Sequence, residues 1–261
     1  GELNTSNNSA SDVTTINPPA QPQPSFDSTG IVNAATYVPP VAAGSIAAVF
    51  GRNLALGQGF ASAIPLPTRL AGSSLQIGGF VAPLFYASPS QVNAQVPWEL
   101  AGQSQAMVTV TVGAVISDQR LVSIAPFAPG LFVINEAGLS QGAIMIAGTQ
   151  LLAAPSDGVG RRPVAAGEFI SIYCTGLGAV SSQPATGNAA KADPLSVTTT
   201  APTVTIGGNM AQVRFSGLAP DAVGLYQVDV QVPMGVPAGA AVPVILNIGG
   251  VTSNTVTIAV Q

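Results

Sequence analysis

The chain has 261 residues, enough for one large domain or two of ordinary size. Only 7% of the residues are charged, against about 25% in an average soluble domain, and the formal net charge is −4. The absence of histidine and the single cysteine, Cys174, exclude histidine-dependent catalytic triads, an internal disulfide and the usual zinc sites. Seven scattered Lys and Arg residues form no basic face, so nucleic acid is excluded as a partner.

The mean hydropathy of +0.47 would suit a membrane protein. No run of about 18 apolar residues occurs, however, because the best candidate, 41–50, is interrupted by Gly44 and Ser45. We therefore expect no membrane span. A chain with so little charge is poorly protected against association, which favours a protein that binds copies of itself.

Residues 1–29 form a polar segment with thirteen Ser, Thr or Asn residues and four prolines. One interpretation is a disordered tail or linker, since this composition buries little apolar surface. The other is an extended arm, ~95 Å long at full stretch, that lies on a neighbouring subunit. In that case its apolar residues Leu3, Val13, Ile16 and Phe26 would form the subunit interface.

From residue 30 onward the pattern predicts short β-strands, punctuated by Gly or Pro every 8–12 residues. The first series comprises Ile46–Phe50, Ser74–Ile77, Ala82–Ala87, Gln91–Val96, Met107–Val112 and Leu121–Ile124. The second series comprises Phe169–Cys174, Thr203–Ile206, Gln212–Phe215, Tyr226–Val232, Val242–Ile248 and Thr255–Val260. No convincing amphipathic helix is present.

The second series repeats the first in the same order. The matching segments are Gly44–Leu54 with Gly167–Leu177, Leu75–Gly79 with Val204–Gly208, Gln91–Pro97 with Gln227–Pro233, and Val108–Gly113 with Val244–Gly249. This is a tandem duplication with small loop insertions. In both copies a Gly-Gly pair suits a tight hairpin turn, and alternation of Val with polar residues predicts a sheet with one wet face.

These patterns predict an all-β fold: two β-sandwiches, at 30–127 and 128–261, preceded by the arm. Between the copies, residues 141–152 read as a hairpin with its turn at Gly148-Thr149. It either opens the second sandwich, which we favour, or belongs to a stiff connector.

The repeated frame resembles the IPT/TIG type of immunoglobulin-like domain. Over about nine-tenths of its length the chain also resembles an uncharacterised family found at the C-termini of predicted secreted proteins of acidobacteria, the Solibacter C-terminal domain family. The segments that carry the resemblance are Asn33–Ala35, Gly44–Leu54, Gln91–Pro97, Ala128–Phe132 and Tyr173–Gly178. The resemblance implies an immunoglobulin-like, extracellular or cell-surface protein, and it supplies no catalytic residues.

Few residues are candidates for ligand contact. The only tryptophan, Trp98, could stack on a sugar ring together with Tyr86 or Phe85, or it could cap the end of the first sandwich. The only cationic pair, Arg161 and Arg162, could grip an acidic polymer, or it could bridge to a nearby acid such as Asp157.

The remaining reactive residues favour structural roles. Asp157, Glu168 and Asp193 lack the spacing of a calcium loop and are expected to be solvated acids. Cys174 is expected to be a buried, inert thiol. Lys191 lies in a presumed loop, which disfavours a covalent lysine crosslink in a core.

The sequence therefore predicts a non-catalytic extracellular structural protein without cofactor or metal. It would assemble with copies of itself into a filament or surface layer through its N-terminal arm. The alternative is a secreted adhesion module that binds a polysaccharide or another surface protein, with the arm as a flexible linker.

Overall fold

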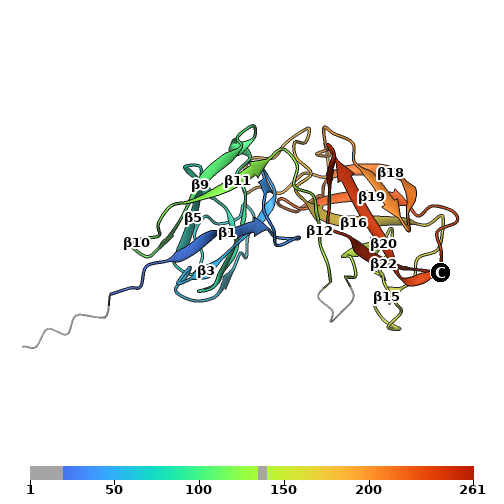
Figure 1. Cartoon of the computed structure of the whole chain (residues 1–261), viewed down its shortest axis with the longest axis horizontal. Helices are drawn as coiled ribbons and strands as arrows, with labels where there is room; N and C mark the ends of the chain where they lie inside the picture. Colours follow the sequence, from blue (N-terminus) through green and yellow to red (C-terminus); the bar gives the residue numbers. More distant parts are fainter. Residues whose placement is uncertain (1–19, 135–139) are drawn as a thin grey trace, which may run out of the picture.

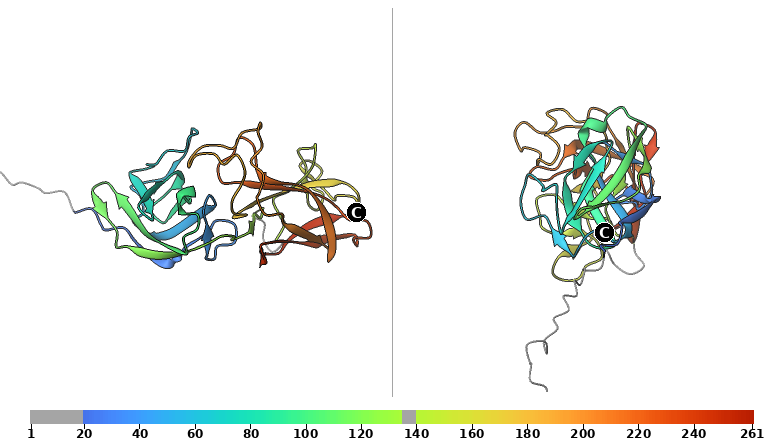
Figure 2. Two further views of the ribbon diagram at one scale, coloured as in Figure 1. Left: turned by 90° about the horizontal axis from the view of Figure 1, so that it is seen from above. Right: turned by 90° about the vertical axis from the view of Figure 1, so that its left-hand side faces the viewer.

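The chain folds into two β-sandwiches that lie side by side along the long axis of the molecule (Figures 1 and 2). The computed structural model describes residues 20–134 and 140–261. Within these residues strands dominate, and the only helical element is a short 3-10 turn, Trp98–Leu100. The expected all-β tandem is confirmed. In the described part of the chain no helix has the length and apolar character needed to cross a membrane.

The first sandwich consists of two mainly antiparallel sheets. One sheet has the order β1 (Ser25–Asn33), β3 (Ile46–Arg52), β8 (Gln91–Gln95), β7 (Leu84–Ala87), β4 (Gly59–Phe60). The other has the order β2 (Val41–Ala42), β11 (Arg120–Ala125), β9 (Gln105–Val112), β5 (Ser73–Ile77), β6 (Phe80–Ala82), with β10 (Val115–Ile116) paired to β9. Inward side chains such as Val49, Val92 and Val110 form its core.

The second sandwich repeats this order. Its first sheet contains β15 (Arg161–Arg162), β14 (Leu152–Ala153), β13 (Ile144–Ile146), β16 (Phe169–Thr175) and β19 (Tyr226–Gln231), with β12 (Gly130–Leu131) paired to β16. The strand order continues through β18 (Asn209–Leu218) into β17 (Thr203–Ile206), β20 (Gly239–Ile248) and β21 (Val251–Thr252), with β22 (Val256–Val260) paired to β20. Because β18 pairs with β17 at one end and with β19 at the other, it belongs to both sheets. In the first sandwich Pro83 separates the equivalent strands β6 and β7, since proline has no N–H for a ladder bond.

The duplication extends to individual hydrogen bonds. The Ser117 hydroxyl accepts from Val110 N at 3.0 Å and donates to Asp118 O, while the Ser253 hydroxyl accepts from Leu246 N at 3.1 Å and donates to Asn254 O. The Gly-Gly hairpin turns also agree, with φ of 60° and 86° at residues 78 and 79, and 58° and 82° at residues 207 and 208. Positive φ at both central residues is why glycine occupies these turns.

The segment expected as an arm contributes to the first sandwich. Strand β1 begins at Ser25 and pairs with β3, and Phe26 lies in the core of its own sandwich with 6% exposure. The expectation that Phe26 contacts a neighbouring subunit is therefore wrong, because β1 completes the sheet of its own chain. Before β1, the side-chain amides of Gln21 and Gln23 donate to Val112 O and Ile116 O, along the β9–β10 hairpin. The other proposed arm contacts, Leu3, Val13 and Ile16, lie outside the described residues.

Trp98 joins the two sandwiches. It follows β8 of the first sandwich but is 4% exposed and belongs to the core of the second. A β-carbon at Gly44 would lie 2.2 Å from the Trp98 ring, so only glycine leaves room for the indole at this point. A buried indole cannot stack on a sugar, which corrects the proposal that Trp98 contacts a ligand. Trp98 also does not simply cap the end of the first sandwich, as the other interpretation had it, because its ring packs in the core of the second.

Hydrogen bonds reinforce this junction. Ile46 N, at the start of β3, donates to Thr175 Oγ1, at the end of β16, over 2.9 Å. Gly187 N donates to Gln95 Oε1 over 2.7 Å. Because these atoms are buried or partly buried, the bonds hold the end of one sheet against the end of the other.

Candidate functional site

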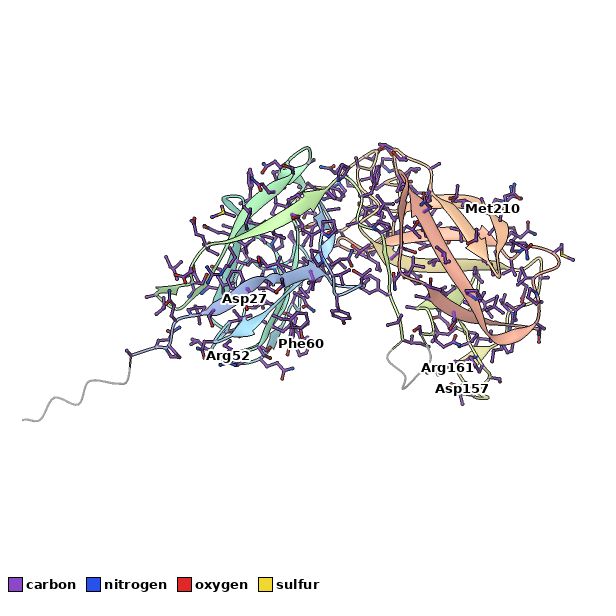
Figure 3. All side chains as sticks on the ribbon, in the orientation of Figure 1. Asp27, Arg52, Phe60, Asp157, Arg161 and Met210 are labelled. Carbon is purple, nitrogen blue, oxygen red and sulfur yellow. The ribbon has the colours of Figure 1, made fainter. Side chains whose placement is uncertain are left out.

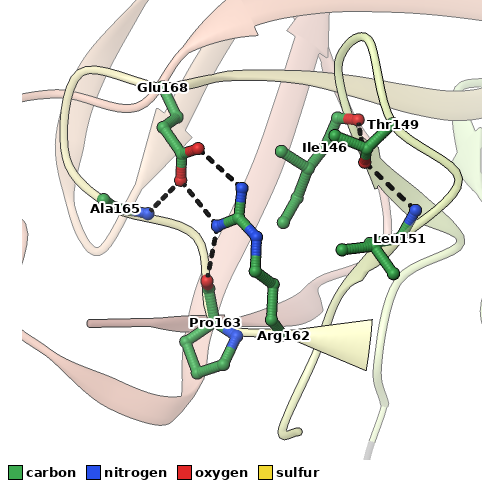
Figure 4. A network of polar contacts seen from close by, with 7 residues as sticks. All are labelled: Ile146, Thr149, Leu151, Arg162, Pro163, Ala165 and Glu168. Atoms are coloured by element: carbon green, nitrogen blue, oxygen red, sulfur yellow. Dashed lines mark hydrogen bonds and ion pairs between the residues drawn. The ribbon is translucent and has the colours of Figure 1, made fainter. Parts of the chain in front are cut away.

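The Arg161–Arg162 pair is engaged in ion pairs within the second sandwich. Arg161 lies 3.4 Å from Asp157, the bridge that the sequence suggested. Arg162 donates two hydrogen bonds to Glu168, at 2.7 and 2.9 Å, and Ala165 N donates a third to the same carboxylate (Figure 4). These bonds, the one from Arg162 first, lower the pKa of Glu168 from 4.5 to about 2. Arg162 therefore fixes the loop before β16 and is not directed toward a polymer.

The other reactive residues take no part in a catalytic or metal site. Asp157 and Glu168 pair with arginines, while Asp193 and Lys191 are exposed in a different loop. Across residues 20–134 and 140–261 no three His, Cys, Asp or Glu side chains gather in a way that could hold a metal ion. Cys174 is fully buried, and burial raises the pKa of its thiol, so it is unreactive in the folded chain.

Tyr86, the remaining candidate, lies on a surface that we call the aromatic–amide face. This face is the outer side of the sheet β3-β8-β7-β4 in the first sandwich. Its six side chains are Tyr37, Phe50, Gln91, Asn93, Tyr86 and Phe60. The neighbouring positions on the same strands, among them Val49 and Val92, point into the core.

The six residues follow one another across the sheet as a continuous row. The Tyr37 and Phe50 rings lie 6.0 Å apart, and Phe50 pairs across the strands with Gln91. Gln91 Nε2 donates to Asn93 Oδ1 over 2.7 Å.

From Asn93 the row continues across β7 to β4. Asn93 pairs with Tyr86, whose ring lies 4.9 Å from that of Phe60. Two aromatic pairs thus flank an amide pair. Three strand spacings, about 14 Å, separate β3 from β4.

Three of the four aromatic rings of this face are open to solvent. Phe60 is 67% exposed, Tyr37 58% and Phe50 37%, whereas Gln91, Asn93 and Tyr86 are half-buried. Adjacent large apolar side chains exposed to this degree mark a binding surface more often than a surface without function. The exposure of Phe60 and Tyr37 contributes nothing to the stability of the core.

A β-bulge turns Tyr86 to the outside. The register between β7 and β8 shifts between Leu84 and Tyr86, so that Leu84 pairs with Ala94 and faces the core while Tyr86 pairs with Asn93. Residues two apart in a regular strand point to the same face, and the extra residue, Phe85, reverses this. The bulge is what places the Tyr86 ring beside Phe60.

The six residues of the face carry no charge. The nearest ionic side chains along these strands are Arg52, at the end of β3, and Asp27, in β1, and they are opposite in sign (Figure 3). Phe60 and Arg52 lie along the same edge of the first sandwich in this view. A neutral face with amide donors and acceptors suits an uncharged, hydroxyl-rich ligand.

A groove of about 670 Å³ adjoins the face at the junction of the sandwiches. Ile46 and Phe85 line it from the first sandwich, and Val223 and Leu225 from the second. Ala61, next to Phe60, also lines it, so the groove continues the face toward the second sandwich. Its lining is mainly apolar and contains no acid or base for catalysis.

The sequence identified only part of this face. The strand containing Gln91 and Asn93 and its wet side were predicted, and Tyr86 was named, but Tyr37, Phe50 and Phe60 were not connected with them. No local signal marks Phe60, because β4 is two residues long and acquires its place by pairing with β7.

No protein-family model and no curated protein matches the chain. Several solved structures match most of this chain at low similarity. A Bacteroides ovatus surface glycan-binding protein from a mixed-linkage glucan utilization locus, in complex with a mixed-linkage heptasaccharide, has 12% identity and a TM-score of 0.34 over 94% of this chain and 46% of its own. The tandem immunoglobulin repeats of Dlar have 12% identity and a TM-score of 0.20 over 85% and 91% of the two chains.

The surface layer protein SbsC, domains 4–9, has 14% identity and a TM-score of 0.20 over 89% of this chain and 30% of its own. This chain thus spans less than half of the glucan-binding and surface-layer structures. At these identities and TM-scores the matches support no argument about the function of this chain.

Proposed function

We propose that the protein is a non-catalytic extracellular module that binds a neutral polysaccharide on its aromatic–amide face. The observation that carries this proposal is the row of exposed Tyr37 and Phe50 at one end, the amides of Gln91 and Asn93 in the middle, and Phe60 at the other end. The extracellular location is supported by the resemblance to secreted acidobacterial domains.

The face offers partners for both the apolar and the polar groups of a sugar chain. Pyranose rings present C–H faces that pack flat against aromatic rings, and their hydroxyls both donate and accept hydrogen bonds. The amides of Gln91 and Asn93 offer the complementary donors and acceptors beside those rings. The distance across the sheet from β3, which carries Phe50, to β4, which carries Phe60, is about 14 Å and favours an oligosaccharide over a single sugar.

The absence of charge within the face selects among polysaccharides. Acidic sugars require cations for tight binding. The six residues include none; Arg52, two residues after Phe50 on β3, lies at the edge of the face, and Asp27, of the opposite sign, lies in the neighbouring strand β1. Neutral chains are therefore the expected class.

The test is a binding measurement with linear neutral hexasaccharides of β-linked glucose, xylose and mannose, with oligogalacturonate as the acidic comparison. We expect one of the neutral probes to bind, and Phe60→Ala and Tyr86→Ala each to weaken it by about tenfold, the equivalent of 1.4 kcal/mol. Isothermal titration calorimetry measures the change.

Phe80→Ala is the matched control. Phe80 is 40% exposed but lies on β6, in the opposite sheet, so its removal should leave affinity unchanged. Thermal unfolding of each variant checks that the fold is kept. If no neutral probe binds, or if Phe60→Ala binds as tightly as the unaltered chain, the proposal is wrong.

Self-assembly is the second proposal. It is supported by the small share of charged residues, 7%, which leaves little electrostatic repulsion between copies. In this proposal residues 1–19, with Leu3, Val13 and Ile16, attach one copy to the next and produce a filament or surface layer. Deletion of residues 1–19 tests it.

A further inference from the structure

The second sandwich presents a face built like the first. On the outer side of its sheet, Tyr173 pairs with Gln227, and Phe215 pairs with Asp229. These pairs occupy the positions of Phe50 with Gln91 and of Tyr86 with Asn93. We call this surface the second face and define it by Tyr173, Gln227, Asp229 and Phe215.

The equivalence includes the side-chain geometry. Gln227 Nε2 donates to Asp229 Oδ1 over 2.9 Å, as Gln91 Nε2 donates to Asn93 Oδ1 over 2.7 Å. The register between β18 and β19 shifts between Val213 and Phe215, and this bulge corresponds to the one between Leu84 and Tyr86 that turns Tyr86 outward in the first sandwich. A bulge that recurs at the same place directs the aromatic ring outward in both copies.

The two faces meet at the junction groove. Ile46 lies in the row of outward residues on β3, and Leu225 precedes β19 by one residue, at the end from which Gln227 projects. Both line the groove, and the Ile46–Thr175 hydrogen bond holds β3 and β16 end to end beside it. The second face is therefore continuous with the first through an apolar groove.

Charge indicates the ligand of the second face. Asp229 replaces Asn93, and a carboxylate accepts hydroxyl hydrogen bonds from a sugar diol but repels an anionic chain. The aromatic residues Tyr173 and Phe215 are half-buried, and Phe169, farther along β16, is 38% exposed with the Arg214 guanidinium 5.9 Å above its ring. Within the second face as defined, the carboxylate of Asp229 favours a neutral sugar chain over an acidic one, and Arg214 lies outside the four residues of this face.

We infer that the second face is a second binding site for the same class of neutral oligosaccharide. The inference rests on the proposed function of the first face. One chain then binds two oligosaccharides, and a long polysaccharide gains affinity when it contacts both sites at once.

The experiment counts hexasaccharides per protein chain. Native mass spectrometry and calorimetry with the neutral hexasaccharide that binds the unaltered full chain should give a stoichiometry of two. Phe60→Ala with Tyr86→Ala should leave one site, and Tyr173→Ala with Phe215→Ala should leave the other. The exchange Asp229→Asn should allow the acidic oligogalacturonate to bind at least as well as before, since it removes the carboxylate.

Controls separate loss of a site from loss of fold. Met210→Ala removes a 63% exposed side chain from β18 on the opposite sheet and should leave the stoichiometry at two (Figure 3). Gln227→Ala disturbs the amide without removing a partly buried ring, and it should weaken the second site by about tenfold if the aromatic variants prove unstable.

The outcomes distinguish the two claims. A stoichiometry of one that is lost in Phe60→Ala with Tyr86→Ala, and is unaffected by Tyr173→Ala with Phe215→Ala or by Gln227→Ala, overturns the second site and keeps the first. Binding that only the second-face variants remove overturns the first site. No binding of any neutral probe overturns both.

Discussion

Tyr86 faces solvent although Leu84, two residues earlier, faces the core. Strict alternation would place both side chains on one side of the sheet, so the two-residue period alone assigns Tyr86 to the interior. The bulge at Phe85 reverses the side chain, and its counterpart at Arg214 does the same for Phe215. The residues that matter most for the proposed site are those for which the two-residue period fails.

The ion pair between Arg162 and Glu168 is also a property of individual side chains. The two side chains are each 33% exposed, yet the contact is bidentate and a backbone N–H adds a third bond to the carboxylate. Such geometry is the case in which an ion pair contributes measurably to stability.

Glu168→Gln tests this contribution. The pKa of Glu168 is lower in the folded chain, about 2, than its ordinary value of 4.5. The ionised carboxylate therefore stabilises the fold above the ordinary value, and this stabilisation is lost as the pH falls from there toward 2. We expect the variant to lose about 1 kcal/mol of unfolding free energy at neutral pH, after discounting for solvent exposure, and to match the unaltered chain in strong acid.

Urea denaturation at several pH values measures the difference. Asp221→Asn is the matched control, because it removes a charge from an exposed residue with φ of 61°, a conformation that asparagine tolerates. Equal unfolding free energies for Glu168→Gln and the unaltered chain at neutral pH would contradict the assigned role.

Strand β1 forms because of the strand with which it pairs, not because of its own composition. Residues 25–29 are polar except for Phe26, and by composition they belong with the preceding segment. They form a strand because β3 offers a sheet edge and because Phe26 enters the core there. The boundary of the folded part therefore lies before Ser25.

This boundary determines how the assembly proposal is tested. Deleting residues 1–19 leaves Gln21, Gln23 and all of β1, so we expect a folded chain that no longer assembles. Deleting residues 1–29 removes Phe26 and half of β1, and it should lower the melting temperature by several degrees through loss of a buried aromatic side chain.

Sedimentation velocity over a range of concentrations measures assembly, and thermal unfolding measures the fold. A full-length chain that stays monomeric at high concentration would refute self-assembly. Equal assembly of the chain without residues 1–19 would show that the attachment lies elsewhere.

At the scale of the whole molecule, Trp98 is the main contact between the two sandwiches. The indole comes from the first sandwich and completes the core of the second, and buried hydrogen bonds from Ile46 N and Gly187 N surround the same junction. Because Trp98 lies in the core of the second sandwich, we expect the two sandwiches to unfold as one cooperative unit and to hold the two proposed binding faces at a fixed distance.

Trp98→Ala should uncouple them. Removing a buried tryptophan costs about 3–5 kcal/mol, and here the loss falls on the contact between the sandwiches. We expect one unfolding transition for the unaltered chain and two for the variant, measured by calorimetry and circular dichroism. Trp98→Phe, which keeps part of the volume, should retain a single transition at a lower temperature. A single transition with an unchanged midpoint in Trp98→Ala would disprove the coupling.

The sequence by itself determined the repeated sandwich. Alternating Val and polar residues, Gly-Gly turns and two matching series of strands are local properties, and strand periodicity translates directly into one buried and one wet side. From these patterns the strands near Gln91 and Gln227, the hairpins at Gly78 and Gly207, and the burial of Cys174 follow.

Only the tertiary structure decided which aromatic residues are exposed next to one another, and that Trp98 is buried. Phe60 reaches Tyr86 through a two-residue strand, and Trp98 enters a core whose other members lie far along the chain. Such contacts depend on bulges and on pairing between distant segments, which a period of two residues does not encode. For this reason the sequence named the buried Trp98 beside Tyr86 as candidate ligand contacts, while the folded chain places Phe60, and not Trp98, next to Tyr86 on the surface.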